Sequence, residues 1–184
     1  MFPTHIYRQR RQALTSRIAD GLLLFIGNEE SPMNYPDNCY PFRQDSTFLY
    51  YFGLDQPDLA AVIDADSGET VLFGTDPTID HIVWMGDLPT IADRAGRAGV
   101  SETRPRRELA EVVGRAAKLG RPVRFLPPYR ASTILRLARI LGLPAEKVPE
   151  QVSLELILAV IDQRNVKSDE EVLELERAAT TSVE

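Results

Sequence analysis

The chain has 184 residues, of which 43% are hydrophobic and 26% are charged, proportions that are ordinary for a globular protein. Its formal net charge of −6 and its pI of about 5.1 argue against the concentrated basic face of a nucleic-acid-binding protein. The longest apolar run, Leu22 to Ile26, is far shorter than the roughly 20 residues that cross a bilayer, so no membrane span is predicted.

Two further features concern the compartment and the partners. Cys39 is the single cysteine, which excludes an intrachain disulfide and fits a reducing compartment. The N-terminus lacks an uninterrupted apolar stretch, so no signal peptide is expected and the cytoplasm is the expected location. Four arginines gather near the N-terminus, and they form either a solvated helix face or a site for an anionic partner: Arg8, Arg10, Arg11 and Arg17.

The first elements are a helix and a buried strand. Thr4 can cap a helix that Asp20-Gly21 would end, and three apolar residues share one face of it: Tyr7, Leu14 and Ile18. The continuous apolar run Leu22 to Ile26 is typical of a strand that is buried on both faces. Residues 28–41 are rich in Pro and Asn and predict a loop.

A hairpin and two helices are expected next. The apolar runs Leu59–Ile63 and Val71–Phe73 flank Asp66-Ser67-Gly68, which has strong turn chemistry. A short helix is expected near Leu88–Ala95, and a clearer one from Arg106 to Leu119.

In the last third of the chain, a predicted strand is followed by predicted helices. Residues 122–128 predict a short strand, and 131–141 predict a helix with these apolar residues inward: Ile134, Leu135, Leu137, Ala138 and Leu141. A long packed helix is expected over 152–165, and Ser168 with Glu171 forms a capping box that opens another helix. Strands alternating with helices predict an α/β fold, a mixed β-sheet flanked by helices on both faces. The helix after Ser168 has no stop signal, so we expect the sequence to be a piece of a longer protein.

No catalytic centre is evident from residue chemistry. The two histidines stand at positions 5 and 81, and neither an HExxH nor a CxxC motif is present, so no metal site is predicted. Asp64, Asp66 and Glu69 lie close in sequence, but a hairpin turn explains them better than a calcium loop. A phosphate-binding glycine loop and a G-x-S-x-G motif are also missing.

Residues 40–53, "YPFRQDSTFLYYFG", combine aromatic residues with Arg43 and Asp45. One interpretation is structural: the rings pack against the edge of the sheet, and the two charged residues anchor a loop. On this interpretation Arg43→Ala should destabilise the fold by ~1–3 kcal/mol, because a buried polar partner would be left unsatisfied. The other interpretation is an interface or a substrate approach, since aromatic residues and Arg are enriched there.

The same stretch resembles the N-terminal-domain signature of the Xaa-Pro aminopeptidase, prolidase and creatinase family. The residues that match the signature in order are Phe42, Arg43, Gln44, Asp45, Ser46, Phe48, Tyr50, Gly53, Pro57 and Asp58. "YRQRRQAL" resembles the opening helix of the family, and "IVWMGDL" resembles a segment that carries a tryptophan in the aminopeptidase branch. Arg164, Lys167, Ser168 and Glu171 resemble the junction at which the catalytic domain begins.

The resemblance implies a fold, a division of the chain and an activity. Residues 1–163 would form the creatinase-like N-terminal domain, which is ribonuclease H-like, and 164–184 would be the first helix of a pita-bread catalytic domain. That second domain would bind two divalent metals, usually manganese, and hydrolyse the bond before proline in peptides with proline second. Its ligands fall on no residue of this sequence, so this chain alone is expected to be inactive. A homo-oligomer, either dimer or tetramer, is also implied.

The resemblance suggests which residues of this domain matter. Trp84, Tyr40, Arg43 and Asp45 are candidates for substrate access or subunit contact. For Trp84 the alternative is an ordinary packed core residue. The residues taken as the structural part of the motif are Phe42, Gln44, Ser46, Phe48, Tyr50 and Gly53.

Other functions stay open. Prolidase and creatinase share the architecture, and some relatives have lost the metals and bind peptides or proteins instead. A free-standing domain that binds a small molecule would require the sequence to be complete.

Overall fold

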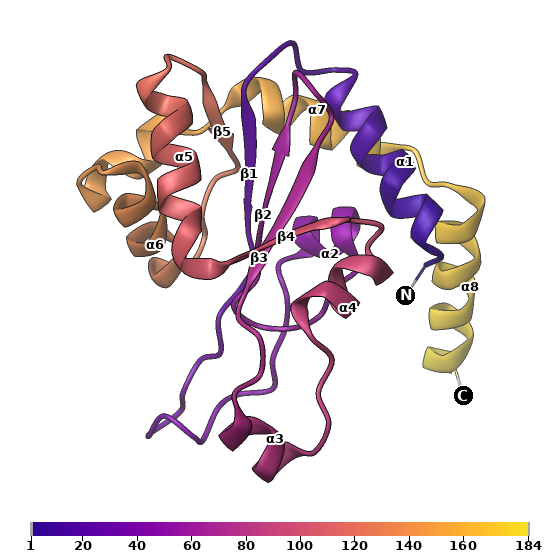
Figure 1. Ribbon diagram of the computed structural model, residues 1–184. Coiled ribbons are helices and arrows are strands. Elements are labelled where there is room, and N and C mark those ends of the chain that lie inside the picture. Colours follow the sequence, from indigo (N-terminus) through magenta and orange to yellow (C-terminus); the bar gives the residue numbers. More distant parts are fainter. Residues whose placement is uncertain (1, 184) are drawn as a thin grey trace.

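A five-stranded mixed sheet forms the centre of the computed structural model, which describes residues 2–183 (Figure 1). The strands are β1 Leu22–Ile26, β2 Ala60–Asp64, β3 Thr70–Gly74, β4 Glu102–Pro105 and β5 Val123–Phe125. Their spatial order is β4-β3-β2-β1-β5.

The pairing places four strand ends at one edge of the sheet. β1 and β3 each pair antiparallel with β2, whereas β5 runs parallel to β1 and β4 runs parallel to β3. The strands β1, β3, β4 and β5 therefore all end at the same edge, which we call the carboxyl edge. The segments that follow them, including 27–45 and 75–90, leave the sheet there.

Helices cover both faces because β1 is apolar on both. Leu23 and Phe25 enter one core cluster, and Leu22 and Leu24 enter the other. The first cluster contains residues of α1 Thr4–Thr15, α2 Ser46–Phe52, α4 Ile91–Arg97 and α7 Leu154–Asn165. The second contains residues of α5 Leu109–Lys118, α6 Ala131–Leu141 and the 3-10 segment η2 Ala145–Gln151. The remaining elements are α3 Ile79–Met85, η1 Arg106–Glu108 and α8 Asp169–Val183.

Much of the predicted architecture is confirmed. The α/β class, the strand at 22–26, the hairpin of β2 and β3, and the helices over 131–141 and 154–165 are all present. The capping box also forms, with the Ser168 N–H donating to Glu171 Oε2 at 3.1 Å and the Glu171 N–H approaching Ser168 Oγ at 3.4 Å.

The first helix is shorter than predicted. It begins after Pro3 and ends at Thr15, so Thr4 is its first residue rather than its cap, and the buried Ile18 lies beyond it. The hydroxyls of Thr15 and Ser16 donate to the carbonyls of Gln12 and Ala13 and so compete with continued helix formation.

Three other expectations were wrong or incomplete. Leu135 is 51% exposed, because it lies beside the stripe of 134, 137, 138 and 141, and the neighbouring Arg136 is buried instead. The strand β4 escaped prediction because its sequence, ETRP, has no apolar residue, which is typical of an edge strand. The short helix expected at 88–95 is α4, which begins later because Thr90 and Asp93 form its capping box.

Candidate functional site

The motif at 40–53 contains a capped helix, not the loop that its sequence suggested. Asp45 Oδ1 accepts the N–H groups of Thr47 at 2.9 Å and Phe48 at 2.8 Å, which starts α2. Gly53, with a φ of 65°, ends it, and its N–H donates to Leu49 O at 2.8 Å. Asp45 therefore does anchor the segment, as the N-cap of α2.

Three of the four aromatic residues of α2 lie in the core. Phe48, Tyr51 and Phe52 are fully buried, and Phe25 of β1 packs against both Tyr51 and Phe52, with ring centroids 5.2 Å and 5.8 Å apart. Burial raises the pKa of Tyr51, whose hydroxyl lies 3.0 Å from Gln163 Oε1 on α7. This part of the motif fastens α2 between the sheet and α7.

Gln44, not Arg43, carries the buried polar contacts of the motif. Gln44 is 1% exposed, and its Oε1 accepts the N–H of Asn28 at 2.6 Å and that of Asp45 at 2.9 Å. Its Nε2 donates to Gln56 O at 2.7 Å, so one side chain joins three segments. Arg43 is exposed, and no hydrogen bond or ion pair of its side chain is found within residues 2–183. The anchoring role expected of Arg43 is therefore wrong, because its neighbour occupies the buried position.

Two of the N-terminal arginines are neither solvated nor free for an anion. Arg10 and Arg11 are buried, and they donate to the carbonyls of Tyr50 at 2.9 Å and Tyr51 at 2.8 Å, near the end of α2. Burial, assisted by the charge of Arg8, lowers the pKa of Arg11 to about 10. Sequence reasoning missed this role because carbonyl acceptors leave no side-chain signature.

Exposed apolar side chains gather beyond the carboxyl edge. They belong to the loop after β1 and to α3, which both extend from this end of the sheet (Figure 1). We call them the distal surface: Met33, Tyr35, Tyr40, Ile79, Ile82, Val83 and Trp84. Trp84 is 84% exposed, so the packed-core alternative is wrong. Large exposed apolar side chains on segments that extend beyond a sheet are candidates for an interaction surface.

A cleft of about 430 Å³ also opens at the carboxyl edge. Its walls are mainly apolar and come from β1, β5, α6 and α7, among them Leu24, Phe25, Ile26, Phe125, Leu137, Ile157, Val160 and Ile161. Two polar side chains that line it are engaged elsewhere: Asp45 caps α2, and Asn28 Nδ2 donates to Arg43 O at 2.9 Å. The cleft therefore offers shape and apolar surface but no paired acid and base.

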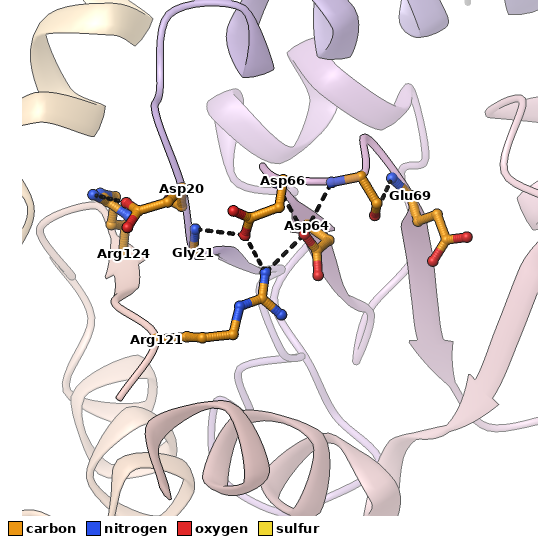
Figure 2. Close-up of polar contacts among 8 residues, drawn as sticks. Asp20, Gly21, Asp64, Asp66, Glu69, Arg121 and Arg124 are labelled. Carbon is orange, nitrogen blue, oxygen red and sulfur yellow. Dashed lines mark hydrogen bonds and ion pairs between the residues drawn. The ribbon is translucent and has the colours of Figure 1, made fainter. Parts of the chain in front are cut away.

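At the opposite edge, a network of ion pairs and hydrogen bonds links the turns that precede β1 and β5 with the turn between β2 and β3 (Figure 2). Arg121 Nη2 bonds Asp64 Oδ1 at 2.8 Å and also Asp66 Oδ2, which accepts the Gly21 N–H at 3.1 Å. Arg124 pairs with Asp20 at 2.8 Å and with Glu155 at 2.9 Å. The acidic residues around 64–69 thus serve a hairpin turn, as their sequence suggested.

This network makes stability depend on pH. Burial raises the pKa of Asp64, but hydrogen bonds from Arg121 and the Ser67 N–H outweigh it and hold the pKa below its ordinary 3.8. The hydrogen bond from Gly21, followed by that from Arg121, lowers the pKa of Asp66 in the same sense. A depressed carboxyl pKa contributes stability that is present above the unfolded-state value and is lost as the pH falls towards the folded-state value.

We therefore expect Arg121→Gln to lower the melting temperature at neutral pH and to have a smaller effect at about pH 3, because the contribution declines once the pH falls below the pKa of the unfolded carboxyls. Thermal unfolding followed by circular dichroism at both pH values measures this. Arg115→Gln is the matched control, since Arg115 pairs with Glu111 on the surface of α5 and such pairs contribute little. A difference for Arg121→Gln that is the same at both pH values would contradict the assignment.

No group of three or more His, Cys, Asp or Glu side chains that could hold a metal ion occurs among the described residues. Within the same part of the chain, no helix is long and apolar enough to cross a membrane.

Comparison with known proteins identifies the fold and the family. The family model for the aminopeptidase P N-terminal domain matches residues 7–123. The chain is 28% identical to human Xaa-Pro dipeptidase over 118 residues, which cover 60% of this chain and 24% of that protein. It is 26% identical to the probable Xaa-Pro aminopeptidase of Aspergillus terreus over 172 residues, 92% of this chain and 33% of that protein.

A solved structure agrees with the family model. Aminopeptidase P from Escherichia coli superposes with a TM-score of 0.75 at 23% identity, over 97% of this chain and 42% of that one. The chain thus spans less than half the length of each of these relatives. Because the family model covers more than half of the chain and the fold agrees with it, this chain belongs to the aminopeptidase P N-terminal domain family.

Proposed function

We propose that this chain is the non-catalytic N-terminal domain of a longer Xaa-Pro aminopeptidase, a hydrolase that releases the residue before proline. The observation that carries the proposal is the family match over residues 7–123. The similar proteins are named as Xaa-Pro peptidases, and each is longer than this chain. The domain would act on peptides only together with the catalytic domain that follows it.

Within that enzyme, we assign subunit contact and control of substrate access to the distal surface. Exposed apolar side chains gain free energy when a partner removes them from water, and Trp and Tyr contribute most at such interfaces. Its aromatic members are Trp84, at 84% exposure, and Tyr35 and Tyr40, each at 57%. The exposed Arg43 follows Tyr40 in the same segment. The partner would be a second copy of the enzyme, in a dimer or a tetramer.

The metals belong to the other domain in this proposal. Two divalent cations, manganese by resemblance, would be held after residue 184 and would activate a water molecule for attack on the peptide carbonyl. Support for a metal comes from one solved relative, a zinc-substituted form of Escherichia coli aminopeptidase P in complex with product. A reducing, cytoplasmic location also stays a proposal, which the free Cys39 supports.

A prolidase is the second candidate, because human Xaa-Pro dipeptidase matches at an identity similar to that of the aminopeptidases. Creatinase and a metal-free relative that binds peptides remain further alternatives. The presence of metal-ligating residues in the downstream domain would separate the metal-free form from the others. Comparing the rates of hydrolysis of dipeptides and of longer peptides would separate prolidase from aminopeptidase.

Replacing the exposed tryptophan tests the assignment. In the longer enzyme, we expect Trp84→Ala to raise KM for X-Pro peptides by about tenfold, equivalent to ~1.4 kcal/mol of lost contact, or to loosen selectivity for peptide length. Steady-state kinetics on peptides of several lengths measures both effects.

The control is Leu119→Ala, which removes a side chain of similar exposure, 73%, from the opposite end of the domain. Because Trp84 is exposed, its replacement should leave the melting temperature of the 184-residue chain unchanged. Kinetics that match the unaltered enzyme for every peptide length would remove Trp84 from the site.

A further inference from the structure

The attachment of α8 to the rest of the domain is concentrated in its first turn. Val172 to Thr181 are all exposed, whereas Glu170 and Glu171 are partly buried. Figure 1 shows α8 leaving the end of α7 and running beside α1. The direction of α8 therefore depends on what its first turn contacts.

Arg10 of α1 is the residue that the first turn meets. Its side chain is 8% exposed, and its Nη2 lies 3.4 Å from Glu171 Oε1, whose side chain is 17% exposed. Nη2 has no hydrogen-bond partner within residues 2–183, so the carboxylate of Glu171 is its counter-ion at a distance slightly beyond a good hydrogen bond. A buried guanidinium without this carboxylate would be an uncompensated charge.

The orientation of Arg10 is itself fixed from three sides. Its guanidinium carbon lies 4.0 Å from the ring centroid of Tyr50 and 4.8 Å from that of Phe2. Its Nη1 donates to Tyr50 O at 2.9 Å. Because the planar guanidinium is stacked and hydrogen-bonded, its Nη2 group points in one fixed direction, and the Glu171 carboxylate lies in that direction.

Glu171 transmits this direction to the helix. Its other oxygen, Oε2, accepts the N–H of Ser168 at 3.1 Å in the capping box. One carboxylate thus closes the start of α8 and pairs with α1. Arg164, at the end of α7, adds a second contact, since its guanidinium carbon lies 5.5 Å from the Tyr50 ring centroid and its Nη1 donates to Thr47 Oγ1 at 3.2 Å.

We propose that Arg10 is a positioning residue: with Tyr50 and Glu171 it forms a latch that sets the angle between α8 and the sheet domain. That α8 opens a second domain rests on the proposed function, and in the longer enzyme the latch would then set the orientation of the catalytic domain. The latch itself lies wholly within this chain, so it can be tested even if the proposed function fails.

Distance measurement by pulsed electron paramagnetic resonance tests the latch in the 184-residue chain. With Cys39→Ser to remove the native thiol, spin labels are placed at Ser67→Cys, in the exposed turn between β2 and β3, and at Glu176→Cys, on the exposed side of α8. We expect one narrow distance distribution in the otherwise unaltered chain. Arg10→Met and Glu171→Gln should each broaden it while circular dichroism shows that the helix content is retained.

Two further variants separate positioning from general stability. Arg17→Gln breaks an exposed ion pair with Asp162 close to the end of α1, at 3.9 Å, and should leave the distribution narrow. Arg10→Lys keeps the charge without the planar stack and should restore part of the order. If Arg10→Met unfolds the chain, the distance distribution of the milder variant Glu171→Gln provides the test. A distribution that stays narrow in folded Glu171→Gln, or one that is already broad in the unaltered chain, would overturn the proposal.

Discussion

Gln44→Leu should destabilise the 184-residue chain by about 2–4 kcal/mol, because each buried polar group left without a partner costs ~1–3 kcal/mol. Leucine has a similar size but can neither accept the N–H groups of Asn28 and Asp45 nor donate to Gln56 O. The N–H of Asn28 is the most costly of the three, since Asn28 is 3% exposed and water cannot readily replace the amide. The loss should stay below the sum of three full penalties, because the Asp45 N–H and the Gln56 carbonyl are only partly buried and water can reach them.

Urea unfolding followed by circular dichroism is the appropriate measurement, since the exposed Trp84 is a poor fluorescence reporter of the core. Arg43→Ala, one residue away, is the matched control and should change the free energy of unfolding by less than about 0.5 kcal/mol, as is usual for an exposed position. Equal losses for both variants would show that Gln44 is not the polar centre of the motif.

Gly53→Ala should cost about 3 kcal/mol, for two separate reasons. Its φ of 65° is a left-handed conformation in which a side chain costs ~1 kcal/mol. A Cβ at this position would also overlap the ring of Tyr7, which is 2% exposed and therefore has no room to move, and overpacking adds ~1–3 kcal/mol.

Gly142→Ala isolates the first of these terms. Gly142 also ends a helix, with a φ of 67°, but a Cβ there would meet nothing within 4 Å. It should therefore lose about 1 kcal/mol, which is the backbone term alone. If urea unfolding gave the same loss for Gly53→Ala and Gly142→Ala, the close packing of α2 against Tyr7 would be refuted.

The sheet and the long helices could be predicted because burial leaves a pattern along the chain. β1 is apolar at every position since both faces are covered, and the hairpin of β2 and β3 surrounds strong turn residues. α2 was missed because its seven residues are too few to show helical periodicity, although Asp45 and Gly53 are a valid cap and stop. β4 was missed because an edge strand does not need an apolar face.

The candidate site was harder to predict than the fold. The motif correctly marked the family, but sequence alone gave the anchoring role to Arg43 when the buried amide belongs to Gln44. Nothing in the sequence distinguishes a buried tryptophan from an exposed one, so the place of Trp84 emerged only from the structure. Arg10 and Arg11 look like a solvated pair because their acceptors are backbone carbonyls and rings on a distant segment.

We propose above that this domain supports peptide hydrolysis in a longer enzyme without performing it. The most direct measurement is the release of the first residue from an X-Pro peptide by the pure 184-residue chain, with and without Mn²⁺, beside the longer enzyme. Our account predicts release by the longer enzyme and none above the buffer rate by this chain in either condition. Turnover by the 184-residue chain that a chelator abolishes would contradict it.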